Sequence, residues 1–483
     1  MTMNDVRAHL LERRWLYATL LTSLWMVLAA MISDPVINLD GMYYIDQARA
    51  LLEGGQVQAT RWTLFSRMLA TLAGVAHLDP LDVALLLVVL VRVVSAALLY
   101  TWVSAIYRNA WPGLAFVLAV SLPWAVAYQS YVIRDSFAWL ALVACLLCAT
   151  RFSRSGQWRW LLLMFPVIAL GVVSRTEMLV LCVIPGWLLL RYSWHRGPRM
   201  TLAVLAAVTA MAAVLLVLGR DMILGHINFY LDALRDSPRY MFYPELVEKL
   251  SAHIHIYARD DLGTVLAVGL AALPLLKITG QLGIYVLPLV LALGSRTARQ
   301  QANADQGASL VVLAGFVLVL LGFVYAMQFL SSRYAVPAAI CLVPWIALGL
   351  QRMWTVYPRL ARAFIVLVLV MAVAGSLTFT SSKHLLRDLG LYIEQHEDDV
   401  APTYFADHRI AFYAHQPYIS EATGALPDDV GALDGYRSLA VTFKMDTAEA
   451  APWLQSLQER YGFTRVVYVR DDDDQLGVAL LVR

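Results

Sequence analysis

Apolar runs of membrane-spanning length dominate this chain and constrain its fold more than any other feature. A helix that crosses about 30 Å of hydrocarbon needs about 20 mainly apolar residues, and eleven runs reach or approach that length. The runs lie near residues 15–33, 82–107, 112–127, 135–151, 158–174, 177–191, 200–219, 272–294, 308–329, 335–350 and 360–380. They predict an all-α polytopic membrane protein with about 11 transmembrane helices.

The composition agrees with this fold class and narrows the choice of partners. Hydrophobic residues make up 60% of the 483 residues and charged residues only 15%, with a mean hydropathy of +0.63. A soluble protein of this size could not bury so much apolar surface, so membrane lipids are expected partners. The net charge of +2 gives no electrostatic reason to expect nucleic acid.

The arginines between the runs indicate which loops face the cytoplasm. One set of loops is rich in arginine and contains Arg7, Arg13, Arg14, Arg108, Arg151, Arg154, Arg159, Arg191, Arg196, Arg199, Arg296, Arg299, Arg352, Arg359 and Arg362. The short loops of the other set carry single arginines, Arg134, Arg175 and Arg333. The positive-inside rule places the rich set in the cytoplasm, together with the N-terminus. After eleven crossings the C-terminal tail then lies outside.

One apolar segment is not counted among the crossings. The sequence WTLFSRMLATLAGVAHL, residues 62–78, carries Arg67 within it. We interpret this segment as a helix at the outer membrane interface. The first run resembles a signal peptide, but it has no clear small-residue cleavage site, so we expect an uncleaved anchor.

Two regions outside the predicted crossings are large, the loop 220–271 and the tail 383–483. The loops 34–81 and 220–271 belong to a transmembrane module, residues 1–382, and are expected to contain interfacial helices. The tail, residues 383–483, has the size of a small domain. Within it TRVVYVR and LGVALLVR flank DDDDQ, which predicts a β-hairpin, and PTYFAD predicts a further strand. We therefore expect a small C-terminal α/β domain outside the cytoplasm.

A polar stretch follows the first run directly. It reads VINLDGMYYIDQARALLEGG, residues 36–55, and its apolar residues recur at helical spacing before Gly-Gly. This pattern predicts a short helix along the membrane surface, with Asp40 near its start and Tyr43 and Tyr44 beside it. Two explanations of Asp40 stay open, an N-terminal cap and a functional carboxylate at the mouth of the bundle.

A second acid lies in the next external loop. In AYQSYVIRDSFAW, residues 127–139, Arg134 and Asp135 come just before the fourth run. Asp135 is either the cap of that helix or a functional group. Two carboxylates at one mouth, Asp40 and Asp135, can hold a divalent cation such as Mg²⁺ or Mn²⁺, or one can act as a base while the other orients it.

Arginines occur in three separate external turns. Arg175 and Glu177 belong to SRTE, and Arg333 and Tyr334 to QFLSSRYAVPA, where a proline marks a helix start. Together with Arg134 these side chains form candidates for phosphate recognition, because the guanidinium fork matches phosphate oxygens. Contact with lipid headgroups is the alternative for each arginine.

Charged residues inside apolar runs are a further signal. Arg92 and Lys277 both lie within such runs, where ionisable groups usually mark function or a buried pair. Of the two, Lys277 is the better candidate for reaching a phosphate. The pair His253 and His255 is a weak candidate for a metal ligand set.

Three of these motifs, in this order and on this side, resemble a known family. LDGMYYIDQA after the first helix, YVIRDSFAW in the second external loop and SRYAVPA at a late helix are similar to the GT-C superfamily of membrane glycosyltransferases. The closest resemblance is to its protein mannosyltransferase and aminoarabinose transferase branch. A polar domain after the last span also fits bacterial members, so the resemblance covers most of the chain.

The resemblance implies a function and a location. It implies transfer of a sugar from a polyprenyl-phosphate donor to a lipid, glycan or protein acceptor at the periplasmic side of a bacterial inner membrane. Asp40 and Asp135 would be the catalytic carboxylates, with a divalent cation as a possible ligand of both. The substrate-binding candidates would be Tyr43, Tyr44, Arg134, Arg175, Glu177, Lys277, Arg333 and Tyr334. Many members carry an adjacent acidic pair in the first loop, whereas Gly41 follows Asp40 here, and this departure bears on metal dependence.

Two other functions compete with this interpretation. A flippase for a lipid-linked sugar would also need basic residues, but such transporters show repeated halves with broken helices in matching positions, which the sequence does not display. A glycan polymerase or ligase of related architecture would concentrate its essential residues in the late loop 220–271. Substitutions in that loop and at the two acids separate these alternatives.

Overall fold

The structure is a computed structural model. It describes residues 3–55, 63–107, 111, 113–194, 202, 262–294, 307–327, 329–377, 381–416, 426–427, 430–444, 447–472 and 476–483. The chain divides into two compact units. The helical unit comprises Met1–Trp25, Leu90–Gln129 and Arg134–Val373, and the α/β unit comprises Met26–Val89, Ser130–Ile133 and Ala374–Arg483. The division falls within three helices, α1 (Met3–Ser33), α4 (Pro80–Ile106) and α18 (Pro358–Ser376).

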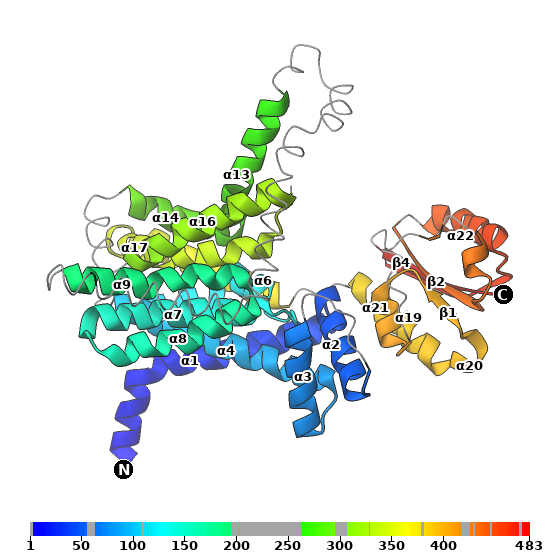
Figure 1. Cartoon of the computed structure of the whole chain (residues 1–483), viewed down its shortest axis with the longest axis horizontal. Helices are drawn as coiled ribbons and strands as arrows, with labels where there is room; N and C mark the ends of the chain where they lie inside the picture. Colours follow the sequence, from blue (N-terminus) through cyan, green and yellow to red (C-terminus); the bar gives the residue numbers. More distant parts are fainter. Residues whose placement is uncertain are drawn as a thin grey trace. The chain divides into compact units, whose positions relative to one another are not determined.

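The helical unit consists of apolar α-helices joined by short 3-10 helices (Figure 1). Its further elements are α5 (Leu114–Ser121), α6 (Pro123–Ala127), α7 (Asp135–Ser155), α8 (Trp158–Ser174), η1 (Thr176–Cys182), α9 (Val183–Trp194), α13 (Leu262–Leu282), η3 (Gly283–Tyr285), α14 (Val286–Leu293), α16 (Gly307–Met327), η4 (Ser332–Ala335) and α17 (Val336–Val356). Helix α7 packs on α8, and both α14 and α16 pack on α17. The apolar window of α17 is 83% buried, against 28% for α16, so α17 is a core helix of this unit and α16 a peripheral one.

The fold class predicted from the sequence is confirmed. Seven described helices are long and apolar enough to cross a membrane: Arg13–Ser33, Pro80–Ile106, Asp135–Ser155, Val268–Leu293, Gly307–Tyr325, Ser332–Val356 and Pro358–Ser376. Each corresponds to one of the predicted crossings. Three other predicted runs form shorter or interrupted helices, and the run 200–219 lies outside the described residues apart from Leu202.

The interruptions have local causes. The run 112–127 is divided into α5 and α6 at Leu122, which adopts an extended conformation because Pro123 follows it. The run 158–174 forms α8, only 17 residues long, and the run 177–191 begins as the 3-10 helix η1 before it continues as α9.

The predicted start of one crossing is wrong. The sequence placed it at residue 272 and assigned 262–271 to an external loop, whereas α13 begins at Leu262. The apolar LGTVLAVGLAALP continues the helix toward the N-terminus without a break. A change of direction instead occurs later, where Gly283 has a φ of +53° and the 3-10 helix η3 separates α13 from α14.

The α/β unit begins with two short helices. The predicted surface helix is α2 (Leu39–Leu52), which ends at the C-cap Glu53 followed by Gly54 with φ of +78°. The predicted interfacial segment forms α3 (Thr63–Ala76). Helices α2 and α3 pack against each other around a cluster of buried apolar side chains that includes Met42, Ile45 and Leu69.

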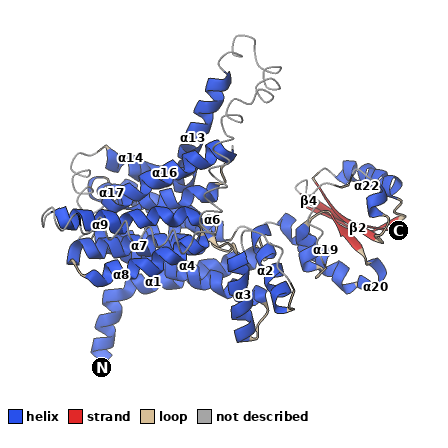
Figure 2. Ribbon diagram, in the orientation of Figure 1, coloured by secondary structure: helices blue, strands red, loops and turns tan. Residues whose placement is uncertain are grey.

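The tail contains a four-stranded mixed sheet, the only strands in the described part of the chain (Figure 2). Its strands are β1 (Thr403–Phe405), β2 (Ser438–Phe443), β3 (Arg465–Asp472) and β4 (Leu476–Val482), in the order β1-β2-β4-β3. The predicted hairpin is β3–β4, an antiparallel pair with Arg465 opposite Val482, and β1 pairs in parallel with β2. The remaining elements are α19 (Ser381–Gln395), α20 (Glu397–Val400), α21 (His408–Tyr413), η5 (Val430–Leu433) and α22 (Thr447–Tyr461).

The compact units do not follow the predicted boundary between residues 1–382 and 383–483. Residues 26–89 group with the tail. The reason is packing, because Phe412 of α21 belongs to the same buried cluster as α2 and α3, and Tyr413 packs against it. The guanidinium of Arg49 on α2 also lies 5.2 Å from the Phe412 ring.

Candidate active site

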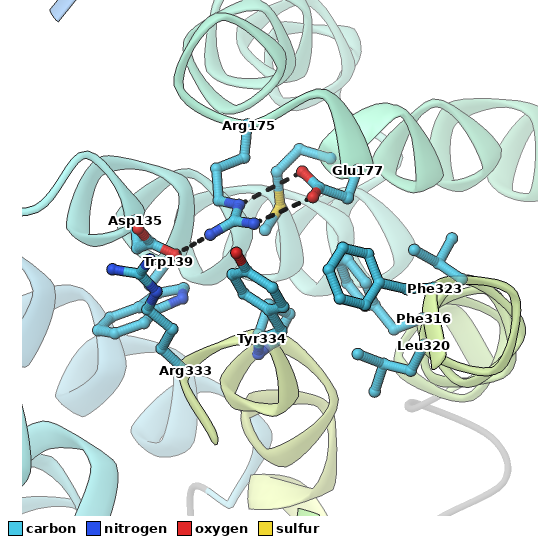
Figure 3. Close-up of a pocket in the computed structure, with 12 residues that line it drawn as sticks. Asp135, Trp139, Arg175, Glu177, Phe316, Leu320, Phe323, Arg333 and Tyr334 are labelled. Atoms are coloured by element: carbon cyan, nitrogen blue, oxygen red, sulfur yellow. Dashed lines mark hydrogen bonds and ion pairs between the residues drawn. The ribbon is translucent and has the colours of Figure 1, made fainter. Parts of the chain in front are cut away.

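A pocket in the helical unit brings together residues from five helical elements and the turn before η1 (Figure 3). Its lining residues are Asp135, Trp139, Arg175, Glu177, Met178, Phe316, Val319, Leu320, Phe323, Arg333, Tyr334 and Pro337. They come from the start of α7, the turn from α8 into η1, one face of α16, and η4 with the start of α17. Five of them were site candidates in the sequence, Asp135, Arg175, Glu177, Arg333 and Tyr334.

The local sequence explains how Arg175 enters the pocket. It is the C-cap of α8 and has an extended backbone, so the chain leaves the helix there and turns into η1. Gly171 favours close packing of α8 on α7, since a Cβ at that position would lie only 3.3 Å from the Cβ atoms of Ala141 and Met178. The Arg175 N–H donates to the Gly171 carbonyl at 2.8 Å, which fixes this turn.

Arg175 links two carboxylates. Its Nε and Nη2 donate to Glu177 at 3.3 and 3.0 Å, and its Nη1 donates to Asp135. The side chains of Arg175 and Asp135 are 8% and 4% exposed, so the pair is desolvated and must be mutually neutralised. Three of the five guanidinium N–H groups therefore bind carboxylates, and Arg175 serves to hold α7 and η1 together at the pocket.

Neither Asp40 nor Asp135 occupies the N-cap position of its helix. The N-cap of α2 is Asn38 and that of α7 is Arg134, while both acids lie in the first turn. The capping explanation for these two acids is thus not supported. A carboxylate oxygen of Asp135 instead accepts a hydrogen bond from Arg175.

The opposite wall of the pocket carries an arginine and a tyrosine on η4. The guanidinium of Arg175 lies 4.3 Å from the Tyr334 ring centroid, and that of Arg333 lies 5.6 Å from it. Phe323 of α16 meets the Tyr334 ring edge-on at 5.0 Å. Figure 3 shows Tyr334 between the Arg175 ion cluster and the phenyl rings of α16, so the pocket has one charged and one apolar side.

Further cations lie around the pocket. Lys277 on α13 donates to Ser332 Oγ at 3.3 Å, next to Arg333 in η4. Arg134 interacts electrostatically with Glu177. Arg92 on α4 is 7% exposed, lies over Trp139 at 5.2 Å and interacts electrostatically with Asp135.

In the described part of the chain, the charged residues in and around the pocket carry an excess of positive charge. Four arginines, at positions 92, 134, 175 and 333, accompany two carboxylates, Asp135 and Glu177. The balance is two positive charges, before Lys277 is counted. A partly buried cluster with this balance is complementary to an anion.

The comparisons with known proteins bear on the architecture. No protein-family model and no curated protein sequence matches the chain. Solved structures do match, among them the crystal structures of ArnT from Cupriavidus metallidurans bound to undecaprenyl phosphate and in the apo state. For each the TM-score is 0.50 at 13% sequence identity, over 97% of this chain and 98% of that one. The chain has the GT-C fold. The resemblance noted in the sequence is thereby confirmed at the level of the fold.

The remaining site residues predicted from the sequence lie in the α/β unit. Asp40 and Tyr43 are partly buried on α2, whereas Tyr44 is 6% exposed and meets Phe65 edge-on at 4.9 Å. Tyr44 is therefore a packing residue between α2 and α3. Asp40 and Asp135 belong to different units, and their joint action stays a prediction.

The divalent cation stays a prediction, and the described residues contain no cluster of three metal-ligating side chains. Within them no three His, Cys, Asp or Glu side chains come together as a ligand set. Asp135 is already neutralised by Arg175. Gly41 also has no room for the second acid that many GT-C members carry, because a Cβ there would lie 2.7 Å from the Val132 Cβ. His253 and His255 lie outside the described residues.

Sequence reasoning missed the aromatic part of the pocket. Phe316, Leu320 and Phe323 share one face of α16, but that helix is apolar on every side, so no periodicity marks the face. Trp139 did leave a signal. It follows Asp135 by four residues, and this spacing places both on one face of α7.

Proposed function

We propose that this protein is an integral-membrane glycosyltransferase that takes a sugar from a polyprenyl-phosphate-linked donor. The observation that carries the proposal is the pocket, where two lining arginines adjoin an apolar wall on α16 and further cations lie around it. A lipid phosphate has the same two parts, an anionic group and a long apolar chain. The GT-C fold supports this assignment, since ArnT of that fold was crystallised with undecaprenyl phosphate.

The pocket residues are assigned roles by their contacts. Arg333 and Lys277, on the neighbouring elements η4 and α13, bind the donor phosphate, with Arg134 adding to the positive potential. Arg175 binds Asp135 of α7 and Glu177 of η1, and so holds in place two of the elements that form the pocket. The charge on the phosphate grows as the glycosidic bond breaks, so cations fixed in advance stabilise the transition state more than the ground state.

The chemical step requires a proton acceptor as well as an anion site. The bond between the sugar C1 and the phosphate oxygen breaks, and the bonding electrons leave with the polyprenyl phosphate. A hydroxyl oxygen of the acceptor forms the new bond to C1, and its proton passes to a carboxylate. We assign that role to Asp40, in the first turn of α2. No step is assigned to a divalent cation.

The location is part of the proposal. The uneven arginine distribution places Arg134, Arg175 and Arg333 on the outer side of a bacterial inner membrane, together with the C-terminal domain. A donor with a long apolar tail reaches such a site from within the bilayer. The acceptor is a lipid, a glycan or a protein outside the cytoplasm.

A transfer assay tests the proposal. The purified protein is incubated with labelled undecaprenyl-phosphate sugars and with cell-envelope fractions, and released undecaprenyl phosphate is measured. We expect release by the wild type and little release by Arg333→Lys, which keeps the charge but loses the fork. Wild-type release no greater than that of Arg333→Ala, over the whole set of donors, contradicts the proposal. Movement of the lipid-linked sugar between leaflets without release supports the flippase alternative.

A further inference from the structure

Trp139 carries a buried hydrogen-bond donor that lacks a partner among the residues that the structure describes. Trp139 is 2% exposed, and its indole N–H makes no hydrogen bond within the described part of the chain. Trp139 lines the pocket. Buried polar groups in native proteins are nearly always paired, so an unpaired N–H on such a residue needs an explanation. A ligand that accepts a hydrogen bond inside the pocket is such an explanation.

The surroundings of Trp139 hold its ring in place. The Arg92 guanidinium lies 5.2 Å from the ring centroid, and the same guanidinium donates to the carbonyl of Tyr128. Trp124 meets Trp139 edge-on at 6.1 Å, and the Tyr128 ring lies 5.5 Å away. A ring enclosed in this way cannot readily turn its N–H toward a protein acceptor.

The size and charge of the pocket indicate what kind of group binds. The pocket has a volume of about 30 Å³, which corresponds to roughly two or three water-sized groups. This space suits phosphate oxygens rather than a sugar ring. The excess positive charge of the surrounding arginines favours an anionic group over a neutral one.

We propose that the indole N–H of Trp139 donates a hydrogen bond to a phosphate oxygen of the ligand in this pocket. Trp139 is thus a binding residue that acts beside the arginines, and Arg92 is a positioning residue that holds its ring. The inference deepens the proposed function and rests on it for the identity of the ligand.

Trp124 provides a matched control. Its indole N–H is also buried and without a partner in the described residues, and it contacts Trp139, but Trp124 does not line the pocket. The substitutions Trp139→Phe and Trp124→Phe therefore remove the same group from the same aromatic cluster. Only the first removes it from the pocket.

The experiment measures binding rather than turnover. Wild type, Trp139→Phe and Trp124→Phe are titrated in one detergent with undecaprenyl phosphate, and with undecaprenol as the lipid without phosphate, and the change in Tm gives Kd. We expect the phosphate lipid alone to stabilise the wild type and Trp124→Phe equally. For Trp139→Phe the Kd should rise about tenfold, the effect of one hydrogen bond to a charged acceptor.

A second substitution covers the case in which Trp139→Phe does not fold. Replacement of Trp139 by 3-benzothienylalanine keeps the shape of the ring and puts sulfur in place of N–H. The same rise in Kd for this variant supports the proposal, and unchanged binding overturns it. An equal loss for Trp124→Phe also overturns it, because the effect is then one of packing. Absence of stabilisation in the wild type overturns the proposed function and this inference together, whereas unchanged binding by the Trp139 variants leaves the proposed function intact.

Discussion

The hydroxyl of Tyr413, at the end of α21, accepts a hydrogen bond of 2.9 Å from the backbone N–H of Ile37. The same hydroxyl donates to the carbonyl of Pro35 at 3.3 Å. Lys383 of α19 adds an ion pair of 2.7 Å with Asp34. Within the α/β unit, the tail thus holds the segment that leads into α2 and Asp40.

Tyr413→Phe is expected to loosen this segment. The substitution leaves the Ile37 N–H, on a residue 8% exposed, without its acceptor, and an unsatisfied buried donor costs about 1–3 kcal/mol. Hydrogen exchange of the Ile37 amide should become faster, with a lower Tm. Tyr357→Phe, at a tyrosine that is 53% exposed, is the control, and unchanged exchange at Ile37 contradicts the prediction.

The same hydroxyl makes the α/β unit sensitive to alkali. Burial raises the pKa of Tyr413 above the ordinary value of 10.0, even though the Ile37 N–H opposes this shift. A group whose pKa is raised in the folded state contributes its stability below the unfolded pKa, and loses it as the pH rises through the folded value. Stability should therefore fall above about pH 10 more steeply in wild type than in Tyr413→Phe. Parallel curves for the two proteins would contradict this.

Gly41→Ala should destabilise the start of α2. Asn38 binds the backbone of Val132 through both amide atoms, at 2.8 and 3.3 Å, and brings that segment against the helix. A Cβ at position 41 would lie 2.7 Å from the Val132 Cβ and 2.9 Å from Ile37 Cγ2. Overpacking of this kind costs about 1–3 kcal/mol.

A double-mutant cycle identifies the clash behind the Gly41→Ala effect. Because the nearest atom is a Cβ, Val132→Gly should relieve Gly41→Ala, whereas Val132→Ala should not. Additive effects of Gly41→Ala and Val132→Gly on the free energy of unfolding would exclude this explanation.

The sequence predicted those parts of the molecule whose structure is determined by neighbouring residues in the chain. Gly54 marked the end of α2, and the acidic turn between two apolar strands marked the β3–β4 hairpin. Three of the arginines were predictable because a charge beside an apolar run stands out. The apolar face of α16 was not predictable, since its environment depends on which helices pack together. The grouping of α21 with α2 likewise depends on Phe412, one apolar residue among many.

Arg175→Ala should destabilise the packing of the elements around the pocket and lower the Tm, rather than only weaken ligand binding. It removes the ion-pair partner that Asp135, with a side chain 4% exposed, shares with Glu177, 19% exposed. Removal of one partner of a buried ion pair costs about 3–5 kcal/mol. The triple variant Arg175→Met, Asp135→Asn, Glu177→Gln removes all three charges and should recover most of the lost Tm while it remains inactive. A triple variant as unstable as Arg175→Ala contradicts this account.

Asp40→Asn tests the proposed proton acceptor. Asn38 rather than Asp40 occupies the N-cap of α2, and Asp40 lies in the first turn. The substitution leaves that cap in place and weakens a favourable interaction with the helix dipole, worth about 0.3–1 kcal/mol. It also removes the group that accepts the proton, and loss of such a group lowers the rate about 10²–10⁴-fold. We expect a folded protein that still binds undecaprenyl phosphate but releases little of it from a sugar donor.

The control for Asp40→Asn must change the charge of the same helix without removing a contact. Asp46 does not serve, because its carboxylate lies 3.2 Å from His408 of the tail. Glu53, the exposed C-cap of α2, does, and Glu53→Gln should leave transfer and Tm near wild type. If Asp40→Asn transfers sugar as fast as Glu53→Gln, Asp40 is not the base. Equal losses in both variants mean that the charge of α2 as a whole matters, and the role assigned to Asp40 alone is then wrong.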